Sequence, residues 1–212
     1  MTTMLVIRHG QSVSNLEGIF TGHLDLALTD MGHRQAQITA EYILQNYCVD
    51  AVYSSDLCRA ADTAKAVAEP LGLHVLTDHR LREIFAGDWE GRTFDELTAR
   101  YPNYTVFRTD IGNCTTDNGE TIAQLSQRVL TAFMEIGGAN PGKTVVIATH
   151  ATPIRAIQCH CEGKPLSQMK DIPWVTNASV TTVIYEDHKL RLQEVCHDAH
   201  LGQITSRFPS NV

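Results

Sequence analysis

The stretch that decides the fold is Met4-Leu5-Val6-Ile7-Arg8-His9-Gly10, close to the N-terminus. Its first four residues are all apolar, a pattern typical of a strand that is buried on both faces of a parallel sheet. Arg8 and His9 follow where that strand ends. In an open parallel sheet, ligands bind beyond the carboxyl ends of the strands. We therefore expect Arg8 and His9 to lie at a ligand-binding site.

The same arrangement of a buried strand followed by a polar residue occurs twice more. Val145–Ala148 leads to His150, and Ala51–Tyr53 leads to Ser55 and a helix that carries Arg59. Helices that start at such strand ends add backbone N–H groups and a positive dipole, and both favour an anion. The three strand ends together predict an anion-binding site.

The predicted helices begin at polar capping residues and end at glycine or proline. They run from Thr29 or Asp30 to about Tyr47, from Ser55 or Asp56 to Pro70, from Thr121 to Ile136 before Gly137-Gly138, and from Thr152 with Pro153 in its first turn. A further strand at Val75-Leu76 and a hairpin of Val180–Tyr185 and Leu190–Val195 around Asp187-His188 complete the pattern.

Strands that alternate with amphipathic helices predict an α/β fold. We expect a three-layer α/β/α sandwich with a largely parallel central sheet. Residues from about 85 to 118 have weak periodicity, and we expect them to form a small, mostly helical cap insertion with one short helix near Thr93–Arg100. The aromatic residues of this region are expected either to line a pocket or to pack in the core: Trp89, Tyr101, Tyr104 and Phe107. A single domain is expected over residues 1–212.

The composition argues against some classes of partner. With 43% hydrophobic and 19% charged residues, the chain is typical of an ordinary globular protein. Its formal net charge of −7 argues against a nucleic acid or an anionic membrane as a partner. An acidic protein that binds an anion needs a local basic pocket, so clustered arginines are expected. The sequence leaves open whether the protein is a monomer or a homodimer.

The cytoplasm is the expected location. Met4–Ile7 is too short for a signal core or a membrane span, and Arg8 interrupts it. Six cysteines are scattered along the chain, and without an export signal they are expected to be free thiols. Cys159-His160-Cys161 resembles part of a metal cluster, but no second pair of ligands has zinc spacing, so no metal site is predicted.

Further motifs extend the strand-end pattern along nearly the whole chain. They are Arg8-His9-Gly10, Asn15, Thr21-Gly22, Leu28–Gly32, Ser54–Ala60, Leu81-Arg82-Glu83 and Thr149-His150, in this order. This ordered set resembles the histidine phosphatase superfamily, also called phosphoglycerate mutase-like. Arg-His-Gly alone is a weak motif, whereas the ordered set is specific. The resemblance implies metal-independent phosphoryl transfer through a phosphohistidine, with no cofactor.

The resemblance implies a role for each matching residue. His9 attacks phosphorus and becomes phosphohistidine. Arg8, Arg59 and His150 hold the phosphoryl oxygens. Glu83 gives a proton to the leaving oxygen and later takes one from water. Contacts to the phosphate or the substrate are expected from Asn15, Thr21, Gly22 and Ala151.

These residue types suit the chemistry. Phosphoryl transfer needs little covalent help and much stabilisation of the charge on the phosphoryl oxygens. Two arginines supply permanently charged, forked donors in the place of a metal ion. They also lower the pKa of the neighbouring His9, which keeps its attacking nitrogen unprotonated. A carboxyl group beside a phosphate dianion favours its protonated form, which suits Glu83 as an acid.

The leading interpretation is a phosphomonoesterase that acts on a small phosphorylated metabolite. The stretch Glu83–Gly91 resembles the phosphatase branch of the family, and the insert between Glu83 and His150 is short for a mutase. The alternative is a cofactor-dependent phosphoglycerate mutase. A third hypothesis is an inactive module that binds phospho-ligands. The joint presence of the catalytic set argues against it: Arg8, His9, Arg59, Glu83 and His150.

One position departs from the family pattern. Family members commonly have glycine after the second histidine, where this chain has Ala151. Alanine still supplies a backbone N–H, but it resists positive φ. The backbone conformation of Ala151 therefore decides whether its N–H suits a phosphate.

Overall fold

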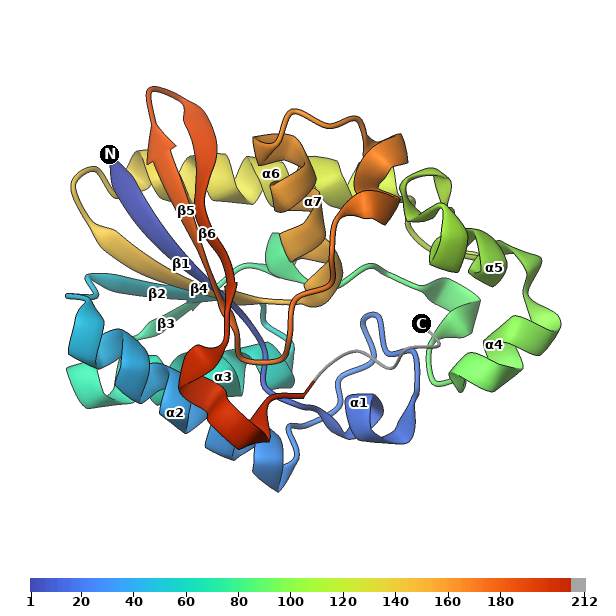
Figure 1. The fold of residues 1–212 in the computed structure, drawn as a ribbon, viewed down its shortest axis with the longest axis horizontal. Helices are drawn as coiled ribbons and strands as arrows, with labels where there is room; N and C mark the ends of the chain where they lie inside the picture. The colour runs from blue at the N-terminus through green and yellow to red at the C-terminus, as the bar shows by residue number, and fades with distance from the viewer. Residues whose placement is uncertain (207–212) are drawn as a thin grey trace.

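The computed structural model describes residues 1–206 of the chain. Within them, a six-stranded sheet in the order β3-β2-β4-β1-β5-β6 forms the centre (Figure 1). Its strands are β1 (Thr2–Arg8), β2 (Ala51–Ser54), β3 (Val75–Thr77), β4 (Thr144–Thr149), β5 (Val180–Glu186) and β6 (Lys189–His197). β1 to β4 are parallel, and β5 and β6 form an antiparallel edge. The predicted largely parallel sheet and its hairpin are confirmed.

Apolar side chains alternate between the two faces of the sheet. In β1, Met4 and Val6 belong to one buried cluster, whereas Leu5 and Ile7 belong to another. Successive side chains of a strand point to opposite faces, so a continuous apolar run needs a cover on both faces.

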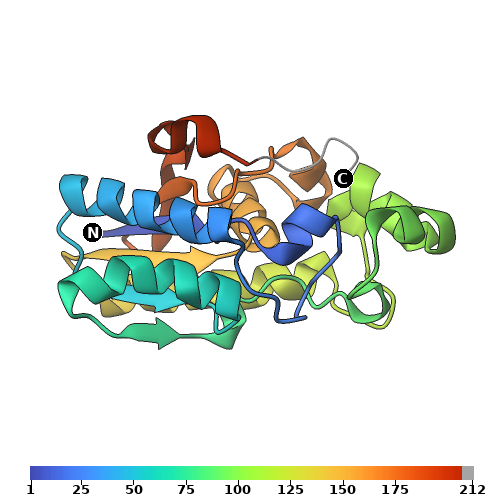
Figure 2. The same ribbon diagram turned by 90° about the horizontal axis from the view of Figure 1, so that it is seen from below.

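Four helices provide these covers: α2 (Asp30–Asn46), α3 (Cys58–Ala68), α6 (Ile122–Ala139) and α7 (Ala151–Cys161). α6 and α7 pack in the cluster of Met4 and Val6, and α2 and α3 pack in the other. The two layers of helices lie on opposite sides of the sheet (Figures 1 and 2). The predicted three-layer α/β/α sandwich is therefore confirmed.

Shorter helices, including 3₁₀ turns labelled η, connect these layers: α1 (Val13–Glu17), η1 (Glu69–Leu71), η2 (His79–Leu81), η5 (Leu166–Asp171) and η6 (Ala199–Ile204). Nowhere in residues 1–206 is a helix both long and apolar enough to cross a membrane. All six cysteines are free thiols, as predicted.

Residues 85–118, here called the cap segment, lie at one end of the molecule, beyond the carboxyl ends of the parallel strands (Figure 1). They contain η3 (Gly87–Trp89), α4 (Phe94–Arg100), α5 (Pro102–Thr109) and η4 (Ile111–Asn113). α4 is the predicted short helix, and Thr93 caps it. α5 is absent from the sequence-based prediction. Pro102 does not break this helix, because it occupies the first helical position, where no N–H is needed.

The start of α3 corrects one prediction. The helix begins after Leu57, and no side chain caps it, so neither Ser55 nor Asp56 is its capping residue. The Ser55 hydroxyl instead contacts the ring of His150, which follows the neighbouring strand β4. Local propensity assigns this serine to a helix cap, but in the folded protein it contacts a residue that is remote in sequence.

The start of α7 corrects another. His150 occupies the N-cap position and Ala151 is the first helical residue, so Thr152 is not the N-cap. Pro153 falls inside the first turn, where backbone N–H groups have no partner within the helix. The helix therefore begins directly after β4, and its first N–H groups lie at the carboxyl ends of the parallel strands.

The end of α6 differs most from the prediction. The helix does not stop at Gly137-Gly138 but runs on to Ala139. A Cβ on Gly137 would lie 2.4 Å from Cγ of Tyr185 and 2.7 Å from Cε of Met4. The glycine therefore permits close packing of the helix on the sheet and does not terminate it.

We expect Gly137→Ala to destabilise the protein by about 1–3 kcal/mol, because overpacking forces side chains or backbone to shift. Gly138→Ala is the matched control, since its Cβ would meet nothing closer than 3.5 Å. This control should be neutral or stabilise by up to about 1 kcal/mol through helix propensity. Urea unfolding of both variants measures the difference. Equal stability of the two variants would contradict the packing role of Gly137.

Candidate active site

A cleft lies at the carboxyl ends of the parallel strands. Most of the predicted site residues line it: Arg8, His9, Asn15, Thr21, Gly22, Arg59, Glu83 and Ala151. His150 is fully buried beside it, and its ring centroid lies 5.1 Å from that of His9. The structure thus brings all of the predicted site residues together.

His9 is held as a neutral imidazole with one defined tautomer. Its Nδ1 lies 2.7 Å from the carbonyl oxygen of Gly10, which can only accept, so the ring proton is on Nδ1. Burial, reinforced by the charges of Arg59 and Arg8, lowers the pKa of His9 well below its ordinary value. The lone pair of Nε2 is therefore available for attack at neutral pH.

His150 is fixed by Ser55. Its Nε2 lies 2.9 Å from the Ser55 hydroxyl, which also accepts the backbone N–H of Leu57 at 3.3 Å. Burial, followed by the charge of Arg59, lowers the pKa of His150 well below its ordinary value. When Ser55 donates to Nε2, the single ring proton is on Nδ1. Nδ1 is buried and has no hydrogen-bond partner within residues 1–206, so its proton would be available to a ligand.

Two buried guanidinium groups supply the positive charge. Arg59 is 1% exposed, and it donates to the carbonyl oxygens of Gly22 at 2.8 Å and Leu24 at 3.0 Å. Arg8 is 2% exposed and donates to the carbonyl oxygen of Val175. Burial lowers the pKa of Arg8 to about 10, against the opposing effect of Glu83, so the group stays charged at neutral pH. A buried cation is costly unless an anion compensates it, so the arrangement favours an anionic ligand.

Glu83 lies at the N-terminus of α7. Its Oε2 accepts the backbone N–H of Thr152 at 3.3 Å, and its Oε1 accepts the N–H of Ile84 at 2.8 Å. These contacts leave the carboxyl group lining the cleft that also contains His9. The cleft thus contains both a carboxyl group and a neutral imidazole nitrogen, the two groups that nucleophilic attack with proton transfer to a leaving group would require.

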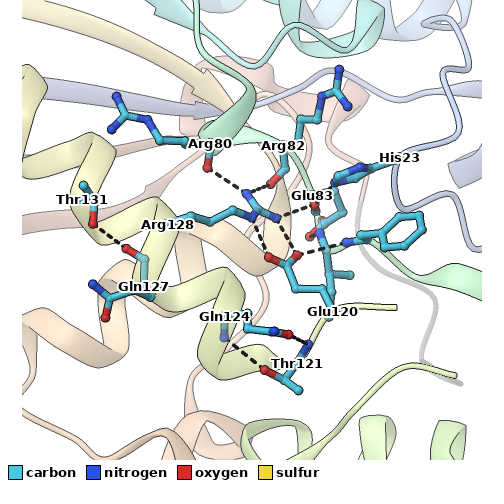
Figure 3. A network of polar contacts seen from close by, with 12 residues as sticks. His23, Arg80, Arg82, Glu83, Glu120, Thr121, Gln124, Gln127, Arg128 and Thr131 are labelled. Carbon is cyan, nitrogen blue, oxygen red and sulfur yellow. Dashed lines mark hydrogen bonds and ion pairs between the residues drawn. The ribbon is translucent and has the colours of Figure 1, made fainter. Parts of the chain in front are cut away.

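The backbone around Glu83 is clamped by Arg128 of α6 (Figure 3). Its guanidinium donates to the carbonyl oxygens of Arg80 and Arg82, both at 2.7 Å, and of Glu83 at 2.8 Å. The same group forms a forked ion pair with Glu120, at 2.7 and 2.8 Å. One side chain therefore fixes three carbonyl groups that lead up to the cleft carboxylate.

Two further contacts complete this clamp. The Glu120 carboxylate accepts the N–H of Phe85 at 3.1 Å, and His23 lies 2.9 Å from the carbonyl oxygen of Glu83. His23 follows Gly22, one of the loop residues that line the cleft. The clamp thus joins the loop, the Glu83 segment and α6 into one unit.

The remaining predicted residues have definite partners. Asn15 accepts from the backbone N–H of Ser12 and from Asn177, both at 3.1 Å through Oδ1, so its Nδ2 faces no competition from these contacts. Thr21 donates to the hydroxyl of Ser14 at 3.1 Å. Ala151 is helical and is not among the residues with positive φ, so the absence of glycine does not strain the backbone there.

Several residues that shape the site are missing from the sequence-based prediction: Glu120, Arg128, Trp174 and Asn177. Ser55 is expected at the strand end, but its contact with His150 is not. Asn177 lies outside any periodic element, yet it donates to the carbonyl oxygen of His9 at 3.0 Å. No local pattern distinguishes these residues, because each acts through a partner far along the chain.

Residues 1–206 contain no group of three or more His, Cys, Asp or Glu side chains placed to hold a metal ion. Cys159, the first residue of the Cys-His-Cys stretch, donates its thiol to the carbonyl oxygens of Lys164 and Pro165. Burial raises the pKa of the Cys159 thiol, which disfavours the thiolate that a metal needs. The Cys159 thiol therefore binds the chain that follows the C-terminus of α7.

The chain is similar to known proteins over most of its length. Residues 4–198 match the family model of the histidine phosphatase superfamily (branch 1). The chain is 34% identical over 214 residues to phosphoglycerate mutase-like protein 4 of Arabidopsis thaliana, covering 97% of this chain and 90% of the relative. It is 30% identical over 201 residues to phosphoserine phosphatase 1 of Hydrogenobacter thermophilus, covering 93% and 94%. A solved mycobacterial glucosyl-3-phosphoglycerate phosphatase in complex with VO3 superposes with a TM-score of 0.85, at 29% identity over 92% of this chain and 99% of that chain.

We expect the two buried histidines to make the protein sensitive to acid. Their pKa values are lowered in the folded state, so below the ordinary value of about 6.5 the unfolded chain binds protons that the folded chain does not. The free energy of unfolding should therefore fall as pH drops below about 6.5, by about 1.4 kcal/mol per pH unit for each histidine. Urea unfolding between pH 5 and 8 measures this slope.

Single substitutions isolate the contribution of each ring. His9→Asn and His150→Asn should each flatten the acid slope, whereas the exposed His33 offers a control, His33→Asn, that should not. The pKa values of His23 and His200 are also lowered by burial, so the difference between variants carries the test and the total slope does not. An unchanged slope in both active-site variants would contradict the prediction.

Proposed function

The chain belongs to the histidine phosphatase superfamily, and on that basis we propose that it is a phosphomonoesterase that hydrolyses a small phosphorylated metabolite through a phosphohistidine on His9. The observation that carries the proposal is the state of His9. Its imidazole is neutral, its Nδ1 proton is held by Gly10, and two buried guanidinium groups stand beside it. That is the arrangement of a nucleophile next to a site for an anion.

In the first step, the Nε2 lone pair of His9 attacks phosphorus. A P–N bond forms as the P–O bond to the alcohol breaks, and the leaving oxygen takes a proton from Glu83. Arg8, Arg59 and the Nδ1–H of His150 stabilise the charge on the phosphoryl oxygens. The Nδ1–H bond from His9 to the Gly10 carbonyl disperses the positive charge that develops on the ring.

In the second step, water attacks the phosphohistidine. The Glu83 carboxylate takes a proton from the water as the new P–O bond forms, and the P–N bond breaks with its electron pair returning to His9. Inorganic phosphate leaves, His9 is again neutral and Glu83 is again protonated for the next turnover. The clamp around Glu83 supports both roles, because the same carboxyl group must reach the alcohol and then the water.

Hydrolysis is favoured over the mutase reaction. Relatives that align with nearly the whole chain or most of it are named phosphoserine phosphatase and glucosyl-3-phosphoglycerate phosphatase. We propose that this enzyme needs no metal, because the buried arginines already supply the positive charge that a metal contributes to other phosphoryl-transfer sites. We also place the reaction in the cytoplasm, where six free thiols fit the reducing conditions.

Phosphate release from p-nitrophenyl phosphate in the presence of a chelator tests the proposal. The wild-type enzyme should be active and should yield an acid-labile phosphoenzyme after a rapid quench. His9→Ala should abolish turnover and labelling, whereas His33→Ala, at an exposed histidine, should leave both intact. A fully active His9→Ala enzyme, or activity that needs added Mg²⁺, would refute this mechanism.

The role of Glu83 predicts a dependence on the leaving group. An alkyl alcohol leaves as a basic alkoxide, so loss of the proton donor in Glu83→Gln should slow phosphorylation of His9 by about 10²–10⁴-fold. p-Nitrophenolate is a stable anion, so the phosphorylation rate with p-nitrophenyl phosphate should fall much less. Dephosphorylation is common to both substrates, so single-turnover phosphorylation rates are the measurement. Equal losses would mean that Glu83 only positions the phosphate.

The clamp extends this prediction to a residue outside the cleft. Arg128→Lys keeps a charge but loses the forked group that holds three carbonyl groups. As in Glu83→Gln, the phosphorylation rate should fall more for an alkyl phosphate than for p-nitrophenyl phosphate, but both rates should fall less. Arg100→Lys, at an exposed position of α4, is the matched control. A uniform loss for both substrates in Arg128→Lys would indicate a structural role alone.

A further inference from the structure

The cleft has two chemically different ends. Its phosphate end contains Arg8, His9 and Arg59. Its other wall is apolar and is made by Ile19, Phe20, Phe94, Phe107 and Trp174. Whatever alcohol the phosphate esterifies must lie along this second wall. The side chains of the wall therefore report on the chemistry of the leaving group.

Positive charge is confined to the phosphate end. Among the described residues that line the cleft, the cationic side chains are Arg8 and Arg59. Arg59 is fixed by the carbonyl groups of Gly22 and Leu24, so it cannot swing outward to a second anion. A carboxylate on the substrate would thus meet Glu83 and aromatic rings instead of a cation.

The apolar wall is backed by a packed aromatic cluster. Phe20 lies 5.2 Å from Phe107 and 5.6 Å from Trp89 between ring centroids, in edge-to-face geometry. Trp89 and Tyr104 are fully buried behind the wall. Of the aromatic residues left open by the sequence, Phe107 lines the cleft and also belongs to the core, Trp89 and Tyr104 pack in the core, and Tyr101 packs against it. Because these rings are closely packed, the side chains of the wall are held in place and the surface stays apolar.

Arg155 stacks against Trp174 and holds it in the wall. Its guanidinium carbon lies 3.9 Å from the ring centroid of Trp174, and it donates to the carbonyl oxygen of Met169 at 2.6 Å. Arg155 is 3% exposed and lines a neighbouring cavity, not the cleft itself. Its charge therefore serves the tryptophan ring as a cation–π partner.

We propose that the alcohol of the substrate carries an aromatic or bulky apolar group, and that the site selects against carboxylated phosphomonoesters. This inference rests on the proposed phosphatase function and narrows its substrate class. It separates this chain from relatives whose names refer to phosphoserine and glucosyl-3-phosphoglycerate. Trp174 and Phe94 are the specificity-determining residues, and Arg155 is a positioning residue for Trp174.

The test compares phosphates of primary alcohols, so that the basicity of the leaving groups stays similar. 2-Phenylethyl phosphate should have a kcat/KM at least about tenfold above that of O-phosphoserine or 3-phosphoglycerate, as expected for one well-filled apolar pocket. Equal or higher values for the carboxylated substrates would overturn the inference. Absence of activity on p-nitrophenyl phosphate would instead refute the phosphatase function itself.

Substitutions in the wall provide a second, independent arm. Phe94→Lys, or Ile19→Lys at a neighbouring position of the wall, places a cation there and should raise the relative kcat/KM for O-phosphoserine about tenfold or more. Trp174→Ala should raise the KM for 2-phenylethyl phosphate much more than the KM for O-phosphoserine, which has no ring to place on the wall. Val106→Ala, exposed on α5 and outside the cleft, is the matched control. Unchanged substrate ratios in the folded variants would overturn the assignment.

Arg155 is tested by rescue. Arg155→Gln should raise the KM for 2-phenylethyl phosphate as Trp174→Ala does, with kcat retained. Arg155→Lys keeps a cation for the ring and should restore much of the affinity. A loss of kcat in both variants, or failure of lysine to rescue, would remove Arg155 from the proposal.

Discussion

The burial of two guanidinium groups at one edge of a parallel sheet is the constraint on which the rest of this site depends. Arg8 and Arg59 are almost completely removed from water, and the effective penalty for such burial is several kcal/mol per ion. Backbone carbonyl groups from three loop positions offset part of this cost. Burial, together with the positive charge of the two guanidinium groups, lowers the pKa of His9 and keeps its imidazole neutral. In the proposed mechanism, the same charges prepare the nucleophile and bind the phosphate.

The carboxyl group that we propose as acid and then as base needs a fixed position, and irregular backbone does not provide one. Glu83 follows a short 3₁₀ turn and lies in no regular element. Arg128 substitutes for that missing regularity by binding the carbonyl groups of the residues before it, with Glu120 as its counter-ion. Because Arg128 belongs to α6, the helix that packs on the sheet also holds the backbone of Glu83, the proposed acid. Stability of the helical layer and geometry of the site are therefore coupled.

The two ends of the cleft come from different parts of the chain. The charged end is built at the strand ends, where parallel topology forces β1 and β4 to terminate side by side. The apolar end comes from the cap segment, from the loop after α1 and from Trp174, which lie outside the register of the central sheet. Chemistry can thus stay constant while the apolar wall changes, because altering a ring such as Phe94 leaves the sheet untouched. The Arg155–Trp174 stack is one such local choice.

The amino-acid sequence alone was enough to predict the α/β class, the strands and the polar residues that meet at the strand ends, because these depend on local periodicity and on polar residues placed directly after apolar runs. It did not determine how Gly137 and Pro102 act, since a glycine that permits close packing and a proline at a first helical position look the same locally as chain breaks. Only the tertiary structure assigned Ser55 to His150 and Arg128 to the backbone of Glu83. In both cases the partner lies dozens of residues away. A side chain's local surroundings specify what it is able to bind, and the packing of remote segments decides what it does bind.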